Sequence, residues 1–237
     1  MNRKGPDAGK IQSMFDSIAP DYDRLNHILS LGVDRIWRRR ALRRIIVGEE
    51  PVQILDIACG TGDFSIEIAS HSPSGTAVTG VDLSEGMLDV MRRKVSAAGL
   101  ADRVSAEQGN SEKMRFADGE FDVATIAFGI RNFENREKAL KEILRVLKPG
   151  GRLVILELSV PSNKVLKWFY CLYFTKILPS VGGLVSGDRA AYRYLPASVL
   201  GFPGKDEWMA VMRDCGYRNV THKAFTSGIC RMYCGEK

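Results

Sequence analysis

The sequence lacks several features that would mark whole classes of protein. Its five cysteines form no CxxC pair and no recognisable metal-ligand spacing, and there are only three histidines. No apolar run reaches the roughly 20 residues that a membrane-spanning helix requires, and internal repeats and low-complexity segments are absent. The cysteine spacing predicts no metal site, and the odd number of cysteines with the lack of a signal peptide predicts a cytoplasmic protein.

What is present is the composition of an ordinary globular domain. The 237 residues are 45% hydrophobic, enough for a substantial core, and this length fits one domain. The net charge of +6 is unevenly placed, because one helical segment carries Arg35, Arg38, Arg39, Arg40, Arg43 and Arg44. This cluster could be a solvated helix face, or it could contact anionic lipid head groups or nucleic-acid phosphates. We expect no nucleic-acid partner, because no RNA-binding motif accompanies the arginines.

The most informative stretch is Gln53–Phe64, with the sequence QILDIACGTGDF. A buried strand that carries Asp56 runs into the glycine turn Gly60–Gly62, and a helix follows. No third glycine is present for a dinucleotide pyrophosphate. An acid that leads GxG instead resembles motif I of the Rossmann-like S-adenosylmethionine (SAM) methyltransferases. In such a site Asp56 would suit the amine of SAM, and the N–H groups of the turn and helix start would suit its carboxylate.

The rest of the chain alternates strands and helices. Beyond the first strand we expect strands at 77–81, 104–106, 121–127, 152–159, 220–225 and 229–234. We expect helices at 64–69, 86–98, 139–147 and 206–215. The prediction is therefore an α/β protein of the class I SAM-dependent methyltransferase type. Its mostly parallel, seven-stranded sheet would carry helices on both faces and an antiparallel last strand.

Polar residues follow three of the predicted strands, at the edge where such sheets bind ligands. Asp82 ends the second strand about 20 residues beyond the glycine turn, where a carboxylate binds ribose hydroxyls. Asn110 and Ser111 follow the third strand, where this fold usually contacts adenine. Arg131 and Asn132 follow the fourth strand and are placed to meet a substrate.

Two further segments are predicted to enclose the site. Residues 1–48 carry amphipathic helical stretches, and their polar residues favour a cover over the site, with a solvated loop as the alternative. Within 160–204 the run VLKWFYCLYFTKIL is bulky on nearly every side but is interrupted by lysines. It could lie at a membrane interface, wrap an apolar ligand, or form core or a dimer surface. We treat 1–237 as one domain with this cover and this insertion.

Three groups of residues outside the glycine turn make a more specific match. They are YDRLN from Tyr22 with Trp37, RVLKPGG from Arg145 with Glu157 and Ser159, and YRYLP from Tyr192 with Ser198. Together they resemble the signatures of the ubiquinone/menaquinone biosynthesis C-methyltransferases (UbiE type), over nearly the whole chain. Asp34 and Ala127 depart from that pattern, which usually has histidine and serine at these positions.

This resemblance implies SAM-dependent methylation of a ring carbon of a polyprenylated quinol. Demethylmenaquinol is preferred, and the benzoquinol of ubiquinone biosynthesis is the alternative. Thr61, Asp82 and the pair Asn110–Ser111 would bind SAM, as would the rest of the glycine turn. A polyprenyl substrate further implies peripheral contact with the inner face of the cell membrane, and a homodimer is left open.

The chemistry of such a methylation suggests roles for four residues. A ring carbon is a weak nucleophile until the neighbouring hydroxyl loses its proton. Arg131 would stabilise the resulting oxyanion or orient a water, and Asn132 would hold the other quinol oxygen. His27 or Asp23 would accept the proton, with local capping as the alternative role for both.

Two other functions remain open on the sequence alone. One is methylation of RNA or of another small molecule by SAM. Methylation of nucleic-acid amino groups requires an (N/D)PP(Y/F) loop after the fourth strand, which this chain replaces with Phe128–Arg131, and no nucleophilic cysteine lies there. The other is a catalytically silent SAM-fold subunit of a membrane-associated biosynthetic complex.

Overall fold

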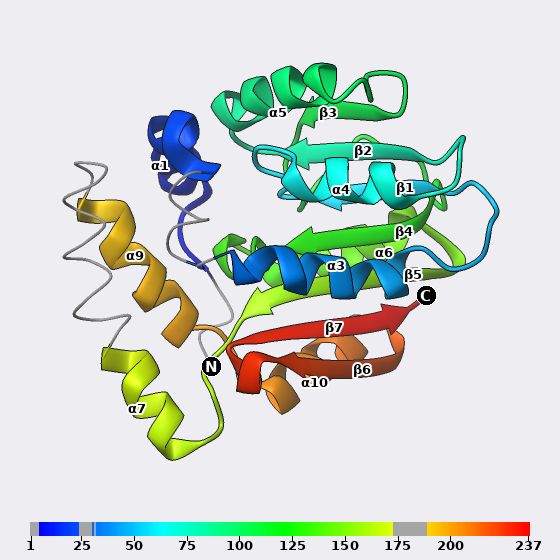
Figure 1. Ribbon diagram of the computed structural model, residues 1–237. Helices are drawn as coiled ribbons and strands as arrows, with labels where there is room; N and C mark the ends of the chain where they lie inside the picture. Colours follow the sequence, from blue (N-terminus) through cyan, green and yellow to red (C-terminus); the bar gives the residue numbers. More distant parts are fainter. Residues whose placement is uncertain (1–4, 24–29, 31, 173–188) are drawn as a thin grey trace.

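The computed structural model describes residues 5–23, 30, 32–172 and 189–237, and the fold is stated for these. A seven-stranded sheet has the order β3-β2-β1-β4-β5-β7-β6 (Figure 1). Six strands run in one direction, and β7 is antiparallel to both of its neighbours. The predicted sheet with its antiparallel last strand is confirmed.

The strands are β1 (Gln53–Ile57), β2 (Ala77–Asp82), β3 (Val104–Gln108), β4 (Phe121–Ala127), β5 (Leu147–Leu158), β6 (Arg218–Phe225) and β7 (Cys230–Glu236). The helices are α1 (Ala8–Ile18), α3 (Val33–Ile45), α4 (Asp63–His71), α5 (Glu85–Ala97), α6 (Arg136–Val146), α7 (Lys164–Leu172), α9 (Arg189–Leu200) and α10 (Lys205–Asp214). Short 3-10 turns are η1 (Ala19–Asp21), η2 (Ile130–Asn132) and η4 (Thr226–Gly228).

The largest difference from the predicted boundaries is at β5. A helix ending at Leu147 and a strand starting at Arg152 were expected, but β5 already pairs with β4 at Leu147. A register irregularity between Phe121 and Val123 accommodates the additional residues. The turn residues Lys148–Gly151 therefore extend the strand rather than separate it from α6.

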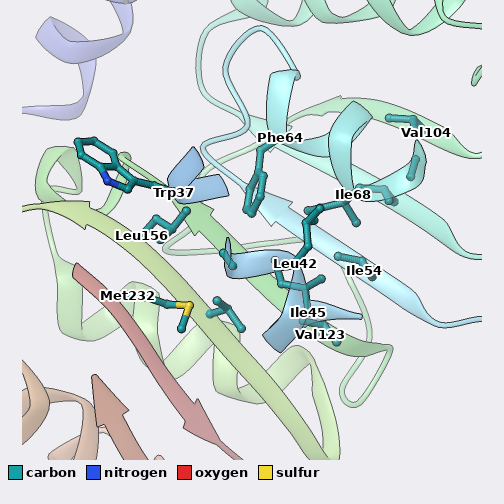
Figure 2. Packing of buried hydrophobic residues seen from close by; sticks show 14 of the residues in the cluster. Trp37, Leu42, Ile45, Ile54, Phe64, Ile68, Val104, Val123, Leu156 and Met232 are labelled. Atoms are coloured by element: carbon teal, nitrogen blue, oxygen red, sulfur yellow. The ribbon is translucent and has the colours of Figure 1, made fainter. Parts of the chain in front are cut away.

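Helices cover both faces of the sheet because side chains alternate along each strand. On β1, Ile54 packs on the face that carries α3, α4 and α5, whereas Leu55 and Ile57 pack against α6 and α10. Figure 2 shows the first face, where helix and strand side chains interlock: Trp37, Leu42 and Ile45 of α3, Phe64 and Ile68 of α4, and Val123 and Leu156 of the sheet. Each such buried side chain contributes about 1.5–3 kcal/mol to the free energy of unfolding.

The helices α1, α9 and α7 lie beyond the carboxyl ends of the parallel strands, on the left of Figure 1. The helix α1 ends at Ile18, as the following Ala19–Pro20 predicts. Part of the predicted cover, an amphipathic stretch through Leu25, Ile28, Leu29 and Leu31, lies outside the described residues. Within the described ranges, no helix is long and apolar enough to cross a membrane.

Candidate functional site

Two adjoining cavities lie at the carboxyl edge of the sheet. The first lies beneath α1, has a volume of about 70 Å³, and is here called the α1 cavity. The second lies between the start of α3, α7 and α9, has a volume of about 300 Å³, and is here called the α3 cavity. The two meet around the glycine turn, where they share Tyr22, Ala58, Gly60, Ala127 and Phe128.

The α1 cavity gathers four of the residues predicted to bind the cofactor: Gly60, Asp82, Asn110 and Ser111. They come from three different strand ends, as expected for parallel strands whose carboxyl ends share one edge. Ile11 and Phe15 of α1 also line this cavity. The N-terminal helix therefore forms one of its walls.

Polar contacts hold α1 in this position. Its Asp16 carboxylate accepts from the Ser84 hydroxyl at 2.5 Å and from the Gly86 N–H at 3.2 Å, both at the start of α5. At the other end of the helix, the N–H of Ala8 donates to Glu134 Oε2 at 3.2 Å. The helix α1 is thus attached near both of its ends by hydrogen bonds, and its residues belong to neither hydrophobic core cluster of the described residues.

The Asp82 carboxylate organises the glycine turn. Its Oδ2 accepts the Gly60 N–H at 2.9 Å, and its Oδ1 accepts the Ser84 N–H at 2.9 Å. Burial raises the pKa of Asp82, and the N–H donors act against that shift. The Gly62 N–H donates to the Cys59 carbonyl at 3.0 Å. The N–H groups of Gly60 and Gly62, which the sequence assigns to the carboxylate of a ligand, therefore bond within the protein instead. These two bonds fix the shape of the turn.

The conformation of this turn requires glycine. Gly60 and Gly62 have φ of 55° and 81°, in the left-handed region that glycine adopts readily. A Cβ at Gly62 would lie 2.4 Å from Cγ of Met91. A Cβ at Gly60 would instead point toward the Tyr22 ring, 3.9 Å away, into the space that the two cavities share. The missing side chain at Gly60 keeps this junction open.

Asp56 lies one residue before the end of β1 and is only 1% exposed. Thr125, its register partner on β4, donates to Oδ1 at 2.8 Å, and Ser65 of α4 donates to Oδ2 at 2.5 Å. Burial raises the pKa of Asp56 to about 6, although these hydroxyl donors lower it. Asp56 therefore joins β1, β4 and α4, and it also lines the α3 cavity.

Replacing Asp56 by asparagine is expected to remove a pH-dependent part of the stability. The pKa is about 6 in the folded protein against 3.8 for an exposed aspartate. The folded protein therefore binds the proton of Asp56 more tightly than the unfolded chain does, and this tighter binding stabilises the fold. The stabilisation is present in full below about pH 4 and is lost as the pH rises through 6. Between pH 5 and pH 7 the wild type should lose about 1 kcal/mol more free energy of unfolding than Asp56→Asn. Urea titrations at both pH values measure this difference, and identical pH dependence of the two proteins would contradict it.

The α3 cavity combines an apolar wall with ionised groups. Its apolar side chains come from five elements: Val33, Trp37, Phe64, Leu158, Tyr170 and Leu195, with Ile229. Its charged residues are Asp23, Asp34, Arg38, Asp56, Asp63 and Arg131. Such a lining suits a flat apolar ligand that carries a few polar atoms.

Arg131 is fixed in the wall of the α3 cavity. Its Nη1 pairs with Glu157 Oε1 at 2.8 Å and donates to the Phe128 carbonyl, and its Nε donates to Ser198 Oγ at 3.3 Å. Glu157, on β5, is fully buried. Burial alone would lower the pKa of Arg131, but Glu157 outweighs it and the pKa lies above its usual value. The result is a permanently charged guanidinium held in one orientation.

Asn132 follows Arg131 directly but lines the other cavity. Its Oδ1 accepts a hydrogen bond from the Tyr194 hydroxyl of α9 at 2.8 Å, and it contributes to the α1 cavity. The η2 turn that carries both residues directs Arg131 to the α3 cavity and Asn132 to the α1 cavity. A ligand that contacts both residues must therefore span the junction at Phe128.

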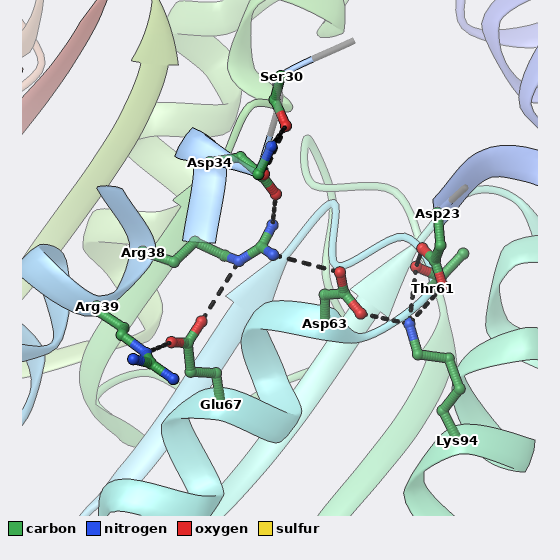
Figure 3. A network of polar contacts seen from close by, with 10 residues as sticks. Asp23, Ser30, Asp34, Arg38, Arg39, Thr61, Asp63, Glu67 and Lys94 are labelled. Carbon is green, nitrogen blue, oxygen red and sulfur yellow. Dashed lines mark hydrogen bonds and ion pairs between the residues drawn. The ribbon is translucent and has the colours of Figure 1, made fainter. Parts of the chain in front are cut away.

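Asp23 is engaged in a polar network at the glycine turn (Figure 3). Its carboxylate accepts from the Thr61 hydroxyl at 2.5 Å and pairs with Lys94 Nζ at 2.6 Å. Lys94 also pairs with Asp63 at 2.5 Å. Both oxygens of Asp23 are thus occupied, which favours a role in closing the site over a role as proton acceptor. His27, the other candidate acceptor, lies outside the described residues.

Arg38 differs from the other arginines of its segment. Arg35, Arg39, Arg40, Arg43 and Arg44 are exposed, as a solvated helix face predicts, but Arg38 is only 8% exposed. It pairs with Asp34 at 2.9 Å and with Asp63 at 3.3 Å (Figure 3). Asp34, which stands where the resembling family usually has histidine, is therefore a partner of Arg38. Of the alternatives left open for this cluster, a solvated face therefore does not describe Arg38.

Replacing Lys94 by methionine is expected to weaken SAM binding about fivefold. The change removes two half-exposed ion pairs, each worth up to about 1 kcal/mol, and leaves Asp23 and Asp63 to repel each other across the turn. Isothermal titration calorimetry measures the affinity. The matched control is Arg92→Met, because Arg92 lies on the same helix and pairs only with Glu85 and Asp89 among the described residues. Equal affinities for the two variants would contradict a closing role for Lys94.

Sequence reasoning missed four residues of the site: Tyr22, Arg38, Lys94 and Glu157. Lys94 lies on an amphipathic helix and carries no local signal of its partners. Glu157 does carry one, because a single acid within the apolar run LVILEL of β5 must be paired when it is buried. The other predicted residues line one or both cavities, except His27, which lies outside the described residues, and Gly62, which lines neither cavity.

Comparison with known proteins shows similarity over nearly the whole chain. A model described as the ubiE/COQ5 methyltransferase family matches residues 3–237. A protein of Geotalea daltonii named ubiquinone/menaquinone biosynthesis C-methyltransferase UbiE is 49% identical over 228 residues, which are 96% of each chain. A demethylmenaquinone methyltransferase of Bacteroides fragilis is 43% identical over 98% of this chain and 94% of its own.

Solved structures share the fold at low sequence identity. A SAM-dependent methyltransferase from Thermotoga maritima, described as a possible histamine N-methyltransferase, has a TM-score of 0.65 at 19% identity, over 95% of this chain and 99% of that one. A putative methyltransferase solved with the Haloferax volcanii Trm112 activator has a TM-score of 0.68 at 17% identity, over 94% and 96%. These likenesses confirm the class I SAM-dependent methyltransferase fold.

Proposed function

The chain belongs to the ubiE/COQ5 methyltransferase family, and from this premise we propose that it methylates a ring carbon of a polyprenylated quinol with SAM. Demethylmenaquinol, converted to menaquinol, is the proposed substrate. The name of the Bacteroides fragilis relative states this substrate, and the name of the Geotalea daltonii relative covers both quinone classes. The single observation that carries the proposal is the buried cation Arg131, held beside the apolar wall of the α3 cavity, which adjoins the α1 cavity.

The residues at the two cavities fit SAM. Asp82 would accept hydrogen bonds from the ribose hydroxyls, and Asn110 and Ser111, which line the same α1 cavity, would contact the adenine. The junction left open at Gly60 leads from that cavity to acidic side chains of the α3 cavity, which suit the amine. When bound, SAM supplies a methyl group that is already activated on a sulfonium.

The chain's own residues would contribute orientation and electrostatics. The Arg131 guanidinium would stabilise negative charge on the ring oxygen, which makes the neighbouring carbon nucleophilic. Glu157 and Ser198 keep that guanidinium in place, so it does not reorganise during the reaction. The apolar wall around Trp37 and Leu195 excludes water and strengthens the interaction. Alignment of the two reactants can supply on the order of 7–11 kcal/mol at best.

The proposal includes the cellular setting. A polyprenyl tail resides in a lipid bilayer, so the protein would work from the cytoplasm in peripheral contact with the inner face of the cell membrane. A homodimer is a further part of the proposal, and light scattering after size exclusion tests it.

Mass spectrometry of quinones from cells that lack the protein tests the reaction, together with turnover of demethylmenaquinol and a benzoquinol by the purified protein. We expect a quinone lighter by one methyl group to accumulate, and we expect turnover of demethylmenaquinol. Turnover of the benzoquinol alone would sink the preference for the naphthoquinol ring. An unchanged quinone pool and no turnover would favour the catalytically silent subunit.

A further inference from the structure

The helix α7 exposes an apolar stripe. Val165, Trp168 and Leu172 are 67%, 61% and 40% exposed. Their spacing of three and four residues places them on one side of the helix. Lys164 and Lys167 are exposed on the same helix. Large apolar side chains beside lysines are typical of a surface helix that binds a partner or a lipid interface.

The other side of α7 belongs to the α3 cavity. Tyr170 lies nearly opposite the stripe, at 100° per residue, and is only 6% exposed. It lines the α3 cavity together with Leu195 of α9. The helix α7 therefore separates the α3 cavity from the surface. One side of it contacts the cavity in which the quinol ring would lie, and the other side carries the exposed stripe.

The charges around the cavity point to an anionic partner. The start of α3 lines the same cavity, and the exposed side of α3 carries Arg35, Arg39 and Arg40. Lys164 and Lys167 add positive charge beside the stripe, and the whole chain has a net charge of +6. An isologous contact with a second copy would bring these cations close to their own equivalents, which is unfavourable. Anionic lipid head groups are complementary to them.

We propose that α7 docks the protein on an anionic lipid bilayer. Val165, Trp168 and Leu172 enter the interface between head groups and acyl chains, and Lys164 and Lys167 contact lipid phosphates. The proposal rests on the proposed function, because a polyprenyl substrate gives the α3 cavity a reason to lie directly behind the docking helix. The quinol ring then reaches the cavity while its tail stays in the bilayer.

Tryptophan fluorescence tests the docking on the intact protein. Trp37 and Trp208 are 5% and 1% exposed, so Trp168 is the exposed tryptophan of the three. Vesicles of phosphatidylcholine with an equal share of phosphatidylglycerol should shift its emission to the blue, and brominated lipids should quench it. Trp168→Phe should abolish both signals. Vesicles of phosphatidylcholine alone should give a much weaker response.

Affinity and activity of a stripe variant complete the test. The triple variant Val165→Ser, Trp168→Ser and Leu172→Ser should bind anionic vesicles about tenfold more weakly or worse, measured by co-sedimentation. The matched control Val47→Ser changes a residue that is 57% exposed beyond the end of α3, and it should bind like the wild type. The triple variant should methylate a water-soluble short-chain quinol normally but lose activity on polyprenyl quinol in vesicles.

The outcomes separate the two proposals. Failure of every quinol to react with the wild type would remove the proposed function, while vesicle binding would still report on α7. Wild-type vesicle affinity in the triple variant would overturn the docking role. The docking role would also be overturned if the wild type did not bind anionic vesicles but formed a dimer that the triple variant disrupts. The stripe would then be a contact between two copies of the chain.

Discussion

Arg131→Lys is expected to lower kcat for quinol methylation about 10²–10³-fold, the usual effect of losing one group that stabilises an oxyanion. Lysine keeps a positive charge opposite Glu157 but loses the planar fork that contacts Ser198 and faces the cavity. The affinity for SAM should change little, because Arg131 does not line the α1 cavity, where the ribose and adenine are proposed to bind, and lysine keeps its positive charge. Single-turnover kinetics and calorimetry on the same preparation measure the two quantities.

Lysine is preferred to alanine at this position for a structural reason. Arg131→Ala would leave Glu157 buried without its partner, which costs about 3–5 kcal/mol of stability and would confuse misfolding with lost chemistry. Arg103→Lys is the matched control, because Arg103 also donates to backbone carbonyls, those of Thr76 and Pro73, outside both cavities. Near-normal kcat for Arg131→Lys would remove Arg131 from the chemistry, and loss of SAM binding would make its role structural.

Asp82→Ala is expected to raise the Kd for SAM at least about 10²-fold. The substitution removes the proposed acceptor of the ribose hydroxyls, and it also leaves the N–H groups of Gly60 and Ser84 without their acceptor. Hydrogen bonds to a charged group contribute about 1.5–3 kcal/mol each. Losing the two proposed bonds between Asp82 and the ribose hydroxyls therefore corresponds to a loss of affinity of about 10²-fold or more. Calorimetric titration of the apo protein with SAM measures this change.

Asp122→Ala separates lost binding from lost stability. Asp122 accepts the Gln53 N–H at 2.8 Å and pairs with Lys148, but it lies at the start of β4, at the opposite edge of the sheet. Both variants should unfold at lower urea concentration than the wild type, and only Asp82→Ala should bind SAM weakly. Equal Kd values for SAM in the two variants would show that Asp82 does not bind the ribose.

The sheet could be predicted because its signals are local. The strands β1, β2, β4 and β5 each contain a short apolar run, the turn glycines follow β1 directly, and Asp82 ends β2. The boundary of β5 was predicted less well, since pairing with β4 overrides the turn signal of Lys148–Gly151. The positions of Asp82, Asn110 and Ser111 follow from the topology alone, because parallel strands bring their carboxyl ends to one edge.

The contacts within the site could not be predicted, because they join residues far apart in the sequence. Asp56 meets a hydroxyl 69 residues away, and Lys94 meets an aspartate 71 residues away. Charge patterning suggested that Arg38 belongs to a solvated face, since its carboxylate partner Asp63 lies on another helix. The separation of Arg131 and Asn132 into two cavities depends on the η2 turn, which has no signature in the sequence.

The hydrogen-bonded cover over the α1 cavity has a consequence for the turnover rate of the protein. The volume beneath α1, about 70 Å³, is far below the roughly 300–1,000 Å³ of pockets that hold a small molecule. We therefore expect the helix to move away, and its bonds through Asp16 and Glu134 to break, when the ribose and adenine of SAM enter or leave this cavity. Turnover then contains a step paced by the movement of a helix through water, and such a step slows as the viscosity of the solvent rises.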